Sequence, residues 1–439
     1  MPTVDAIVVL PGIMGSELAT ADGRVLWGFS NVKDAVRNIV TLALGHVDEL
    51  LVTDEDRSGK RRVRATKLLS YPAFLERWGG CEEYSSLLEE LRAQALDSRA
   101  VLAFPYDWRL SISHNAALLA RRSDEHLSTW REIVRAEFPK ADPKDVKLKF
   151  VCHSMGGLVA RHALQTIDGL AAETRRLVTL GSPFMGSTKA VELLTLGRGL
   201  PIPVKAEAAR KLAASCPGVH DLLPRYECVR TGDDTARGLT ADEVGIPQSD
   251  FDEARTRWEQ LRIGGSGPKV EMSMLAGLWQ PTQRWVRFDA GQPSFEQDDG
   301  DGTVLEGSAR PDRSGPRHGM AQGHGALQKS REGILWVLDQ VLDRPPLKTA
   351  GPSAGVGLDL ADSVAPGLVS CRVLGEGVAR PDVRSEEFAT GATVRWTRTR
   401  RGEPPVFQAE LRPGFHRVIL RMGGDPITKI IQVAAEEPA

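Results

Sequence analysis

The segment 146–167 constrains the fold of this chain more than any other part of its sequence. Hydrophobic residues at 146, 148 and 150 alternate with lysines, which is typical of a strand, and a helical pattern begins after residue 155. The string Cys-His-Ser-Met-Gly-Gly stands between them at 152–157. A serine in a tight turn between a strand and a helix is typical of a nucleophile elbow, which lifts the hydroxyl above a sheet. We therefore predict that Ser154 is a nucleophile.

The elbow departs from the pattern G-x-S-x-G at one position, because Cys152 stands where the first glycine usually lies. Cysteine is small enough for this place, and we interpret Cys152 as a packing residue because it precedes the apex of the turn. The alternative for Ser154 is a helix-capping serine beside a glycine-rich turn. The start of the following helix presents free N–H groups, so the Met155 amide is a predicted oxyanion donor.

The first part of the chain, up to about residue 345, alternates short apolar strands with helical patterns. This order predicts an α/β-hydrolase fold, with a mostly parallel central sheet and helices on both faces. Strands are expected at 6–10, 100–104, 146–152, 177–180 and 271–275, and helices at 82–96, 116–137, 156–167 and 326–342. Insertions at about 28–75 and 186–268 are too long for ordinary connections. The first contains an amphipathic helix candidate at 31–43, either a surface helix or a lid over an apolar pocket.

The composition of the sequence changes after residue 345. Proline, glycine and serine at 346–355 predict a linker, and short β-type runs at 356–439 predict a small all-β sandwich of immunoglobulin-like type. A chain of 439 residues exceeds what one hydrophobic core usually supports, which agrees with two domains.

Composition excludes several classes of function. With 56 basic and 58 acidic side chains, the net charge of −2 gives no electrostatic reason to expect nucleic-acid binding. The apolar run 6–10 is too short for a signal sequence or a membrane span. Five cysteines form no C-x-x-C pair and argue against a disulfide framework, although Cys216 and Cys228 could pair in an oxidising compartment. We expect a cytoplasmic protein with no metal or organic cofactor, since no metal-ligand motif is present.

Six motifs occur in order along the chain, at 11–18, 104–109, 153–157, 181–187, 300–304 and 323–324: PGIMGSEL, FPYDWR, HSMGG, GSPFMGS, GDGTV and GH. Their order and spacing make residues 5–342 resemble the lecithin:cholesterol acyltransferase family, which includes lysosomal phospholipase A2 and phospholipid:diacylglycerol acyltransferases. The resemblance implies an α/β-hydrolase that works through an acyl-enzyme, and it gives Met14 the place of the second oxyanion donor. A glycine-flanked loop directly after the first strand is suited to aim a backbone N–H in this way.

The acid of a catalytic triad is predicted at Asp301, which glycines flank on both sides. By the resemblance, the matching aspartate orients the catalytic histidine. Asp298 and Asp299 precede it and remain alternatives, and an acidic solvent loop is the other interpretation of this segment.

Nine histidines compete for the role of base. In this fold the histidine follows the acid in sequence, and only His318 and His324 lie both after Asp301 and before the last helix of the domain. The family histidine opens the last helix, which favours His324, and the segment 310–322 is expected to be a mobile loop. His153 adjoins the nucleophile, but we expect its side chain to point away from the hydroxyl and to serve packing.

Two further features are interpreted near this site. Asp107 and Arg109 are expected to form a structural ion pair that braces a loop. Trp27 stands near the place where the family has an aromatic residue beside its lid, so acyl-chain contact is a hypothesis.

The predicted function is that of a serine acyl-ester hydrolase or O-acyltransferase that acts on phospholipid or other lipid acyl esters. Hydrolysis and transfer share the acyl-enzyme, so the sequence does not decide between them. The lid region is expected to touch membranes peripherally, and the β-domain is a candidate site for a protein partner. No cysteine precedes Cys81, whereas extracellular family members have a cysteine-closed lid loop and a secretion signal. The alternatives are an esterase for small non-lipid esters and a partner-controlled binding or effector protein.

Overall fold

The structure is a computed structural model. It describes residues 2–28, 46–60, 62–69, 84–200, 204–232, 235–263, 270–311, 318–344, 357–360, 363–365, 367–374, 381–387, 390–399, 404–421 and 426–433. The predicted helix at 31–43 and the predicted linker at 346–355 lie outside these ranges.

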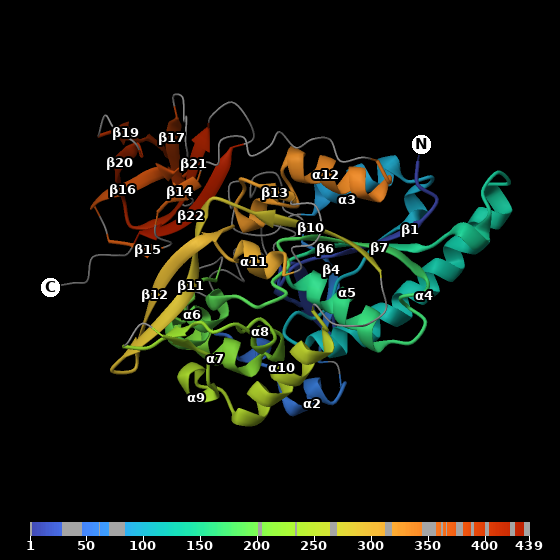
Figure 1. Cartoon of the computed structure of the whole chain (residues 1–439), viewed down its shortest axis with the longest axis horizontal. Coiled ribbons are helices and arrows are strands. Elements are labelled where there is room, and N and C mark those ends of the chain that lie inside the picture. Colours follow the sequence, from blue (N-terminus) through green and yellow to red (C-terminus); the bar gives the residue numbers. More distant parts are fainter. Residues whose placement is uncertain are drawn as a thin grey trace.

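A six-stranded sheet forms the centre of the larger part of the molecule (Figure 1). Its order is β13-β10-β7-β6-β1-β5, and every pair is parallel. The strands are β1 (Ala6–Leu10), β5 (Val101–Ala103), β6 (Leu148–His153), β7 (Thr174–Leu180), β10 (Glu271–Gly277) and β13 (His318–Met320). The predicted parallel sheet is confirmed. The edge strand β13 lies inside the segment that was predicted to be a mobile loop, of which 312–317 lie outside the described ranges.

Helices cover both faces of this sheet (Figure 1). The helices α4 (Ile112–Glu137) and α5 (Met155–Thr166) pack against each other on one face, and α3 (Ser85–Gln94) and α12 (Arg331–Val341) meet on the other. The central strands β1 and β6 are fully buried, which the apolar run of β1 requires and which places Lys149 of β6 in the interior. The sheet and its helices therefore share one hydrophobic core.

The second insertion folds into helices that stand beside the carboxyl edge of the sheet. They are α6 (Thr188–Leu196), α7 (Ala206–Ser215), α8 (Pro217–His220), α9 (Ala241–Val244) and α10 (Gln248–Gln260). A second sheet follows in the order β12-β11-β8-β9, made of β8 (Val229–Arg230), β9 (Ala236–Arg237), β11 (Gln280–Asp289) and β12 (Gln292–Gly300). The long hairpin β11–β12 was not predicted from the sequence. Its two-residue turn has positive φ at Ala290 (48°) and Gly291 (79°), the geometry that antiparallel hairpins favour.

The described part of the first insertion supports the N-terminal loop. It contributes a 3-10 turn (Asp48–Leu50), α2 (Asp54–Arg57) and the strand β4 (Val63–Leu68). This strand completes a three-stranded sheet with β2 (Ser16–Thr20) and β3 (Val25–Trp27). A short helix, α11 (Glu306–Ala309), lies between β12 and β13 in the chain.

The C-terminal part has two sheets with their own hydrophobic core. One sheet has the order β14-β16-β20-β19 and the other β15-β22-β21-β17-β18. Their strands are β14 (Gly357–Asp359), β15 (Ser363–Val364), β16 (Gly367–Leu374), β17 (Asp382–Glu387), β18 (Thr393–Arg395), β19 (Thr397–Arg398), β20 (Val406–Leu411), β21 (Gly414–Arg421) and β22 (Ile427–Val433). The sandwich lies beside the hairpin, where β14 contacts β11 (Figure 1). The predicted fold class, an α/β-hydrolase followed by a small all-β part, is thus confirmed.

The described helices and cysteines also bear on function. None of their helices is long and apolar enough to span a membrane. Cys152, Cys216, Cys228 and Cys371 are all buried free thiols, so Cys216 and Cys228 are not paired.

Candidate active site

Ser154 stands in the sharp turn between β6 and α5. Its backbone is strained, with φ 51° and ψ −126°, and its N–H donates to the Leu180 carbonyl at 2.9 Å. Gly156 and Gly157, which follow Ser154, have no room for a side chain. A Cβ at position 156 would lie 2.5 Å from the Pro11 carbonyl oxygen, and one at 157 would lie 2.1 Å from Ser182 Oγ. The local sequence therefore forms an elbow because only glycine admits such close approach.

The structure brings Ser154, His324 and Asp301 together in one hydrogen-bonded chain. His324 Nε2 lies 2.8 Å from Ser154 Oγ, and His324 Nδ1 lies 2.7 Å from Asp301 Oδ2. The carboxylate fixes the proton on Nδ1, so Nε2 is the nitrogen that accepts a hydrogen bond from the serine hydroxyl. The three side chains come from three different loops at the carboxyl edge of the main sheet.

The surrounding backbone fixes the Asp301 carboxylate. Its Oδ1 accepts N–H groups from Thr303 (2.9 Å) and Val304 (2.6 Å), while its own carbonyl accepts the His324 N–H at 2.8 Å. The residue is only 2% exposed. Because Oδ1 is occupied by the loop, Oδ2 is directed at the histidine.

The two alternative acids lie elsewhere. Asp298 forms an ion pair with Arg284 on the hairpin, and Asp299 Oδ1 accepts the Trp279 N–H at 2.6 Å. Burial raises the pKa of Asp299 above its ordinary value. Each of these two carboxylates is thus engaged away from the Ser154–His324–Asp301 chain.

The alternative base is also outside this chain. His318 lies on β13 with its ring 5.6 Å from that of Trp336. Burial, together with the charge of Arg310, lowers the pKa of His318. The three-residue turn that begins at His324 precedes α12, which starts at Arg331 after the Ser330 cap rather than at 326 as predicted.

Two backbone amides are the candidates for the oxyanion hole. Met155 is the first residue of α5, so its N–H has no acceptor within the helix. Met14 has a left-handed backbone (φ 64°) in a turn closed by the Gly15 N–H on the Gly12 carbonyl at 3.1 Å. The indole of Trp27 donates to the Met14 carbonyl at 2.9 Å, which holds this turn in place.

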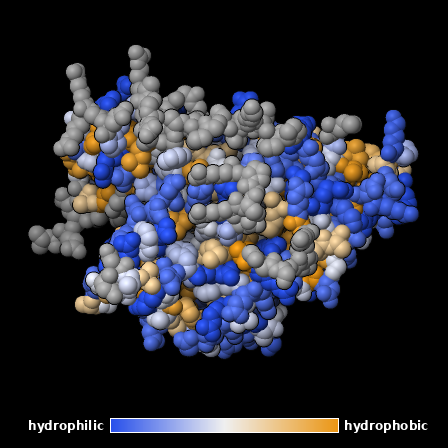
Figure 2. Space-filling model, viewed as in Figure 1, coloured by the Kyte–Doolittle hydropathy of each residue, from blue (hydrophilic) through white to orange (hydrophobic). Residues whose placement is uncertain are grey.

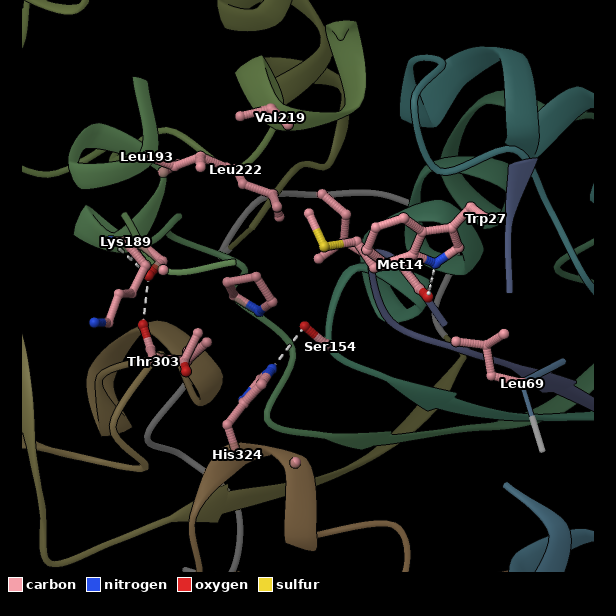
Figure 3. Close-up of a pocket in the computed structure, with 17 residues that line it drawn as sticks. Met14, Trp27, Leu69, Ser154, Lys189, Leu193, Val219, Leu222, Thr303 and His324 are labelled. Carbon is pink, nitrogen blue, oxygen red and sulfur yellow. Dashed lines mark hydrogen bonds between the residues drawn. The ribbon is translucent and has the colours of Figure 1, made fainter. Parts of the chain in front are cut away.

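A pocket of about 210 Å³ opens beside the Ser154 hydroxyl (Figure 3). Its wall combines the N-terminal loop, both insertions and the acid loop, with Ile13, Met14, Trp27, Leu69, Pro183, Ser187, Lys189, Ala190, Leu193, Gly199, Val219, Leu222, Thr303, Val304, His324 and Gly325 around the serine. Most of these side chains are apolar. By contrast, much of the outer surface in Figure 2 is hydrophilic, with apolar residues in small patches.

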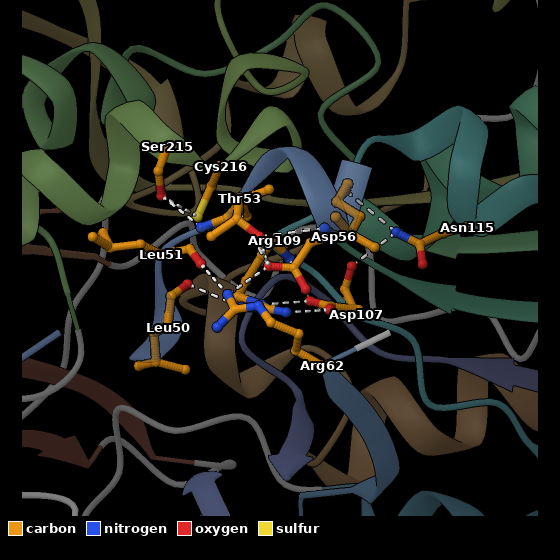
Figure 4. Close-up of polar contacts among 12 residues, drawn as sticks. Leu50, Leu51, Thr53, Asp56, Arg62, Asp107, Arg109, Asn115, Ser215 and Cys216 are labelled. Atoms are coloured by element: carbon orange, nitrogen blue, oxygen red, sulfur yellow. Dashed lines mark hydrogen bonds and ion pairs between the residues drawn. The ribbon is translucent and has the colours of Figure 1, made fainter. Parts of the chain in front are cut away.

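A buried ion pair braces the loop that follows β5 (Figure 4). Arg109 is fully buried and binds Asp107 through two hydrogen bonds of 2.9 and 2.6 Å, while it also donates to the Leu50 carbonyl at 3.1 Å. The Arg109 carbonyl accepts the Gly218 N–H at 3.0 Å, next to the pocket residue Val219. The predicted structural ion pair is confirmed, and it joins the first insertion to the second.

Sequence reasoning missed the contacts of His153. Its ring binds Tyr84 and the backbone of His324 rather than serving packing alone. The position of His153 beside Ser154 was the only feature of the sequence that could have indicated a role at the site, because Tyr84 and His324 are remote in sequence. In the described residues no cluster of histidine, cysteine and acidic side chains could hold a metal ion.

Comparisons with known proteins agree with this fold. Residues 63–254 match the family described as lecithin:cholesterol acyltransferase. The solved Tle4-Tli4 complex is similar with 14% identity and a TM-score of 0.53, over 77% of this chain and 98% of that chain. No curated protein sequence matches the chain.

Two further solved structures show weaker similarity. The lipase BlEst2 of Bacillus licheniformis has 14% identity and a TM-score of 0.35, over 98% of this chain and 94% of that chain. The phospholipase PlaB from Legionella pneumophila has 13% identity and a TM-score of 0.24, over 80% and 87%.

The resemblance noted in the sequence and the match over residues 63–254 point the same way. They support an enzyme that acts on lipid acyl esters, as a hydrolase or an acyltransferase. Residues 63–254 of this α/β-hydrolase fold are thus similar to the lecithin:cholesterol acyltransferase family.

Proposed function

We propose that the protein is a serine acyl-ester hydrolase or O-acyltransferase of lipids, with phospholipid as the preferred substrate and Ser154 as nucleophile. The observation that carries the proposal is the unbroken chain from Asp301 through His324 to Ser154, with contacts of 2.7 and 2.8 Å, at the mouth of an apolar pocket. Such a chain activates a serine hydroxyl, which is a weak nucleophile on its own.

The first half of the reaction forms the acyl-enzyme. Ser154 Oγ attacks the ester carbonyl carbon while His324 Nε2 takes the hydroxyl proton, and Asp301 stabilises the resulting imidazolium. The Met14 and Met155 amides stabilise the oxyanion. When the tetrahedral intermediate collapses, the C–O bond to the alcohol breaks and His324 returns the proton to the leaving oxygen.

The second half reverses these roles with a new acceptor. Water or an alcohol gives its proton to His324 and attacks the acyl carbon, and the bond to Ser154 Oγ breaks as that oxygen regains a proton. Water yields a fatty acid and an alcohol yields a new ester. The chemistry at Ser154 is the same in both cases, so the acceptor decides between hydrolysis and transfer.

The pocket supports a long acyl chain as the bound group. Trp27 and Leu69 line one side and Leu193, Val219 and Leu222 line the other. Burial of each methylene contributes about 0.8 kcal/mol, so a fatty chain gains far more from this wall than an acetyl group does.

The experiment is incubation with radiolabelled phosphatidylcholine vesicles, with and without a long-chain alcohol, for the wild type and Ser154→Ala. We expect release of labelled acid, or labelled ester when the alcohol is present, and no product above background from the variant. Ser370→Ala on the C-terminal sandwich is the matched control. A fluorophosphonate probe that left residue 154 unmodified in folded protein would contradict the proposal, and turnover of short nitrophenyl esters alone would favour the small-ester alternative.

A partner-controlled effector is the second candidate. Tle4, whose fold this chain shares, was solved as the Tle4-Tli4 complex. We propose the C-terminal sandwich as the site of a protein partner and the cytoplasm, where the four buried thiols would stay reduced, as the compartment. Expression toxicity that disappears with Ser154→Ala would support this candidate, and harmless overexpression would count against it.

A further inference from the structure

His153 is the last residue of β6 and precedes the nucleophile, and its ring packs beside the ring of His324. It is 1% exposed, and its ring centroid lies 4.9 Å from that of His324. His153 Nε2 is 3.1 Å from the carbonyl oxygen of His324, and Nδ1 is 3.0 Å from the hydroxyl of Tyr84. Both ring nitrogens are thus engaged by groups that belong to other segments.

The hydrogen-bonding partners fix the protonation of the ring. A carbonyl oxygen can only accept, so Nε2 carries the proton and donates it to His324. The neutral ring then has an acceptor at Nδ1, and the Tyr84 hydroxyl donates to it. In this arrangement the oxygen of Tyr84 can itself accept a hydrogen bond.

The acceptor lone pair of Tyr84 is used by the oxyanion loop. The Gly12 N–H donates to the Tyr84 hydroxyl at 2.8 Å, and the Gly12 carbonyl closes the turn that contains Met14. A directed chain of hydrogen bonds therefore runs from Gly12 through Tyr84 and His153 to the backbone of His324. It joins the loop of one oxyanion donor to the residue that carries the base.

We propose that His153 is a positioning residue, which holds the His324 backbone and the Gly12–Gly15 turn in register with Ser154. The inference rests on the proposed function, because it assigns no separate chemistry. His153 is covalently attached to the nucleophile, so one residue sets the positions of nucleophile, base and oxyanion turn relative to one another. Few water molecules reach a side chain with 1% exposure, so water does not replace these hydrogen bonds when the ring is removed.

The test uses two substitutions at this position. Leucine fills the space without polar atoms, whereas glutamine offers an acceptor and a donor on neighbouring atoms. With a phospholipid substrate we expect His153→Leu to lower kcat about tenfold, the size of one net hydrogen bond, and to leave KM within about twofold. His153→Gln should recover most of that loss, and Tyr84→Phe should behave like His153→Leu.

His162 is the matched control. It is 4% exposed, it lies on the following helix, and its ring binds Gln260 at 2.9 Å without contact to the three site residues. His162→Leu should lower the melting temperature but leave kcat per folded molecule and the rate of fluorophosphonate labelling unchanged.

The outcomes separate this inference from the proposed function. If the fluorophosphonate probe labels Ser154 at the same rate in the wild type and in His153→Leu, the positioning role is overturned and the proposed function stands. Equal loss in His153→Leu and His153→Gln also overturns it, because shape would then matter and hydrogen bonding would not. Wild-type protein that resists labelling overturns the proposed function, and the inference falls with it.

Discussion

The two ends of strand β6 are built differently. At its carboxyl end stands Ser154 with a positive φ of 51° and a hydrogen-bonded link to His324. Near its amino end Lys149 is fully buried and contacts Asp5 at 3.1 Å and Asp343 at 2.6 Å. One end has a strained backbone at the proposed nucleophile, and the other has charge pairs around a buried ammonium group.

This difference separates function from stability within one sheet. Ligands of open parallel sheets bind at the carboxyl ends of the strands, where loops from many segments converge. The ion pairs at the amino end tie the sheet to the segment after α12, since Lys149 also donates to the Val341 carbonyl at 2.7 Å. We therefore expect changes at the carboxyl end to reduce turnover and changes at the amino end to reduce stability.

The largest effect is expected from Asp301→Asn. An amide cannot hold the imidazole of His324 in the tautomer that accepts the Ser154 proton, so kcat should fall by about 10⁴. The substituted side chain keeps its shape, and the thermal unfolding midpoint should change little. Initial rates of acyl release and a melting curve measure the two quantities.

Asp299→Asn is the control for this substitution. Its carboxylate accepts the Trp279 N–H at 2.6 Å, and an amide oxygen can replace that bond. Activity should stay within about threefold of wild type, the value of part of one hydrogen bond. Equal activity losses in the two variants would show that the acid was assigned to the wrong residue.

Local patterns predicted the elbow and the parallel sheet because the alternation in β6 and the glycines after Ser154 can be read along the chain. The groups that make these glycines necessary, Pro11 and Ser182, are remote in sequence and became visible only in the structure. The hairpin β11–β12 escaped prediction because Gln280–Asp289 mixes polar and apolar residues on both faces. The three-residue strand β13 is too short to leave a periodic signal.

Contacts between remote residues had no signal in a single sequence. His153 reaches Tyr84 across 69 positions and His324 across 171. In the sequence, Lys149 occupies a polar position of an alternating strand pattern. No neighbouring residue in the sequence indicates that its side chain is buried beside the end of α12. The candidate triad could be predicted because its members lie in motifs, whereas the residues that support it could not.

The second-largest effect is expected from a substitution near the amino end of β6. Lys149→Met removes the buried ammonium and leaves the Asp5 carboxylate, which is 4% exposed, with Arg175 as its remaining cation. Loss of one partner of a buried pair typically costs about 3 kcal/mol, so the free energy of unfolding should fall by roughly that amount. Urea denaturation measures it, and turnover per folded molecule should be unchanged.

Lys147→Met provides the comparison on the same segment. Its side chain is 31% exposed and pairs with Glu173 at 3.3 Å, so the loss of stability should be below about 1 kcal/mol. If Lys149→Met were as stable as Lys147→Met, or if it lowered kcat, the proposed separation of the two ends would be wrong.

The third expected effect is a dependence of stability on pH that comes from His220, a residue near the pocket. Burial lowers the pKa of His220, on α8 beside the pocket residue Val219, to about 4 from 6.5, against the opposing charge of Asp250. Because the unfolded chain binds the proton more readily, the stabilisation is complete above pH 6.5 and is lost as pH falls toward 4. Between pH 7.5 and 5 we expect this residue to account for roughly 2 kcal/mol of unfolding free energy.

His220→Gln should flatten that part of the curve. Glutamine can still donate to the Ala214 carbonyl, which the His220 ring binds at 3.1 Å. Urea denaturation at several pH values measures the difference between variant and wild type, in which the contributions of the other histidines cancel. Parallel curves for the two proteins would assign the acid sensitivity to another group.

The smallest effect probes the oxyanion turn at the carboxyl end. Trp27→Phe keeps an aromatic ring against Trp108, whose centroid lies 5.3 Å away, but removes the indole N–H that holds the Met14 carbonyl at 2.9 Å. We expect kcat to fall by about five- to tenfold, since one hydrogen bond then no longer restrains the turn.

Trp130→Phe makes the same chemical change on the helix α4, where the indole donates to the Val4 carbonyl at 2.8 Å. Both variants should lose about 1 kcal/mol of stability, because each leaves one carbonyl without its donor. Only Trp27→Phe should lower kcat, since Val4 precedes the amino end of β1 and Met14 follows its carboxyl end. Equal kcat values in the two variants would mean that the turn at Met14 holds its shape without Trp27, and that strain at the carboxyl end does not depend on this side chain.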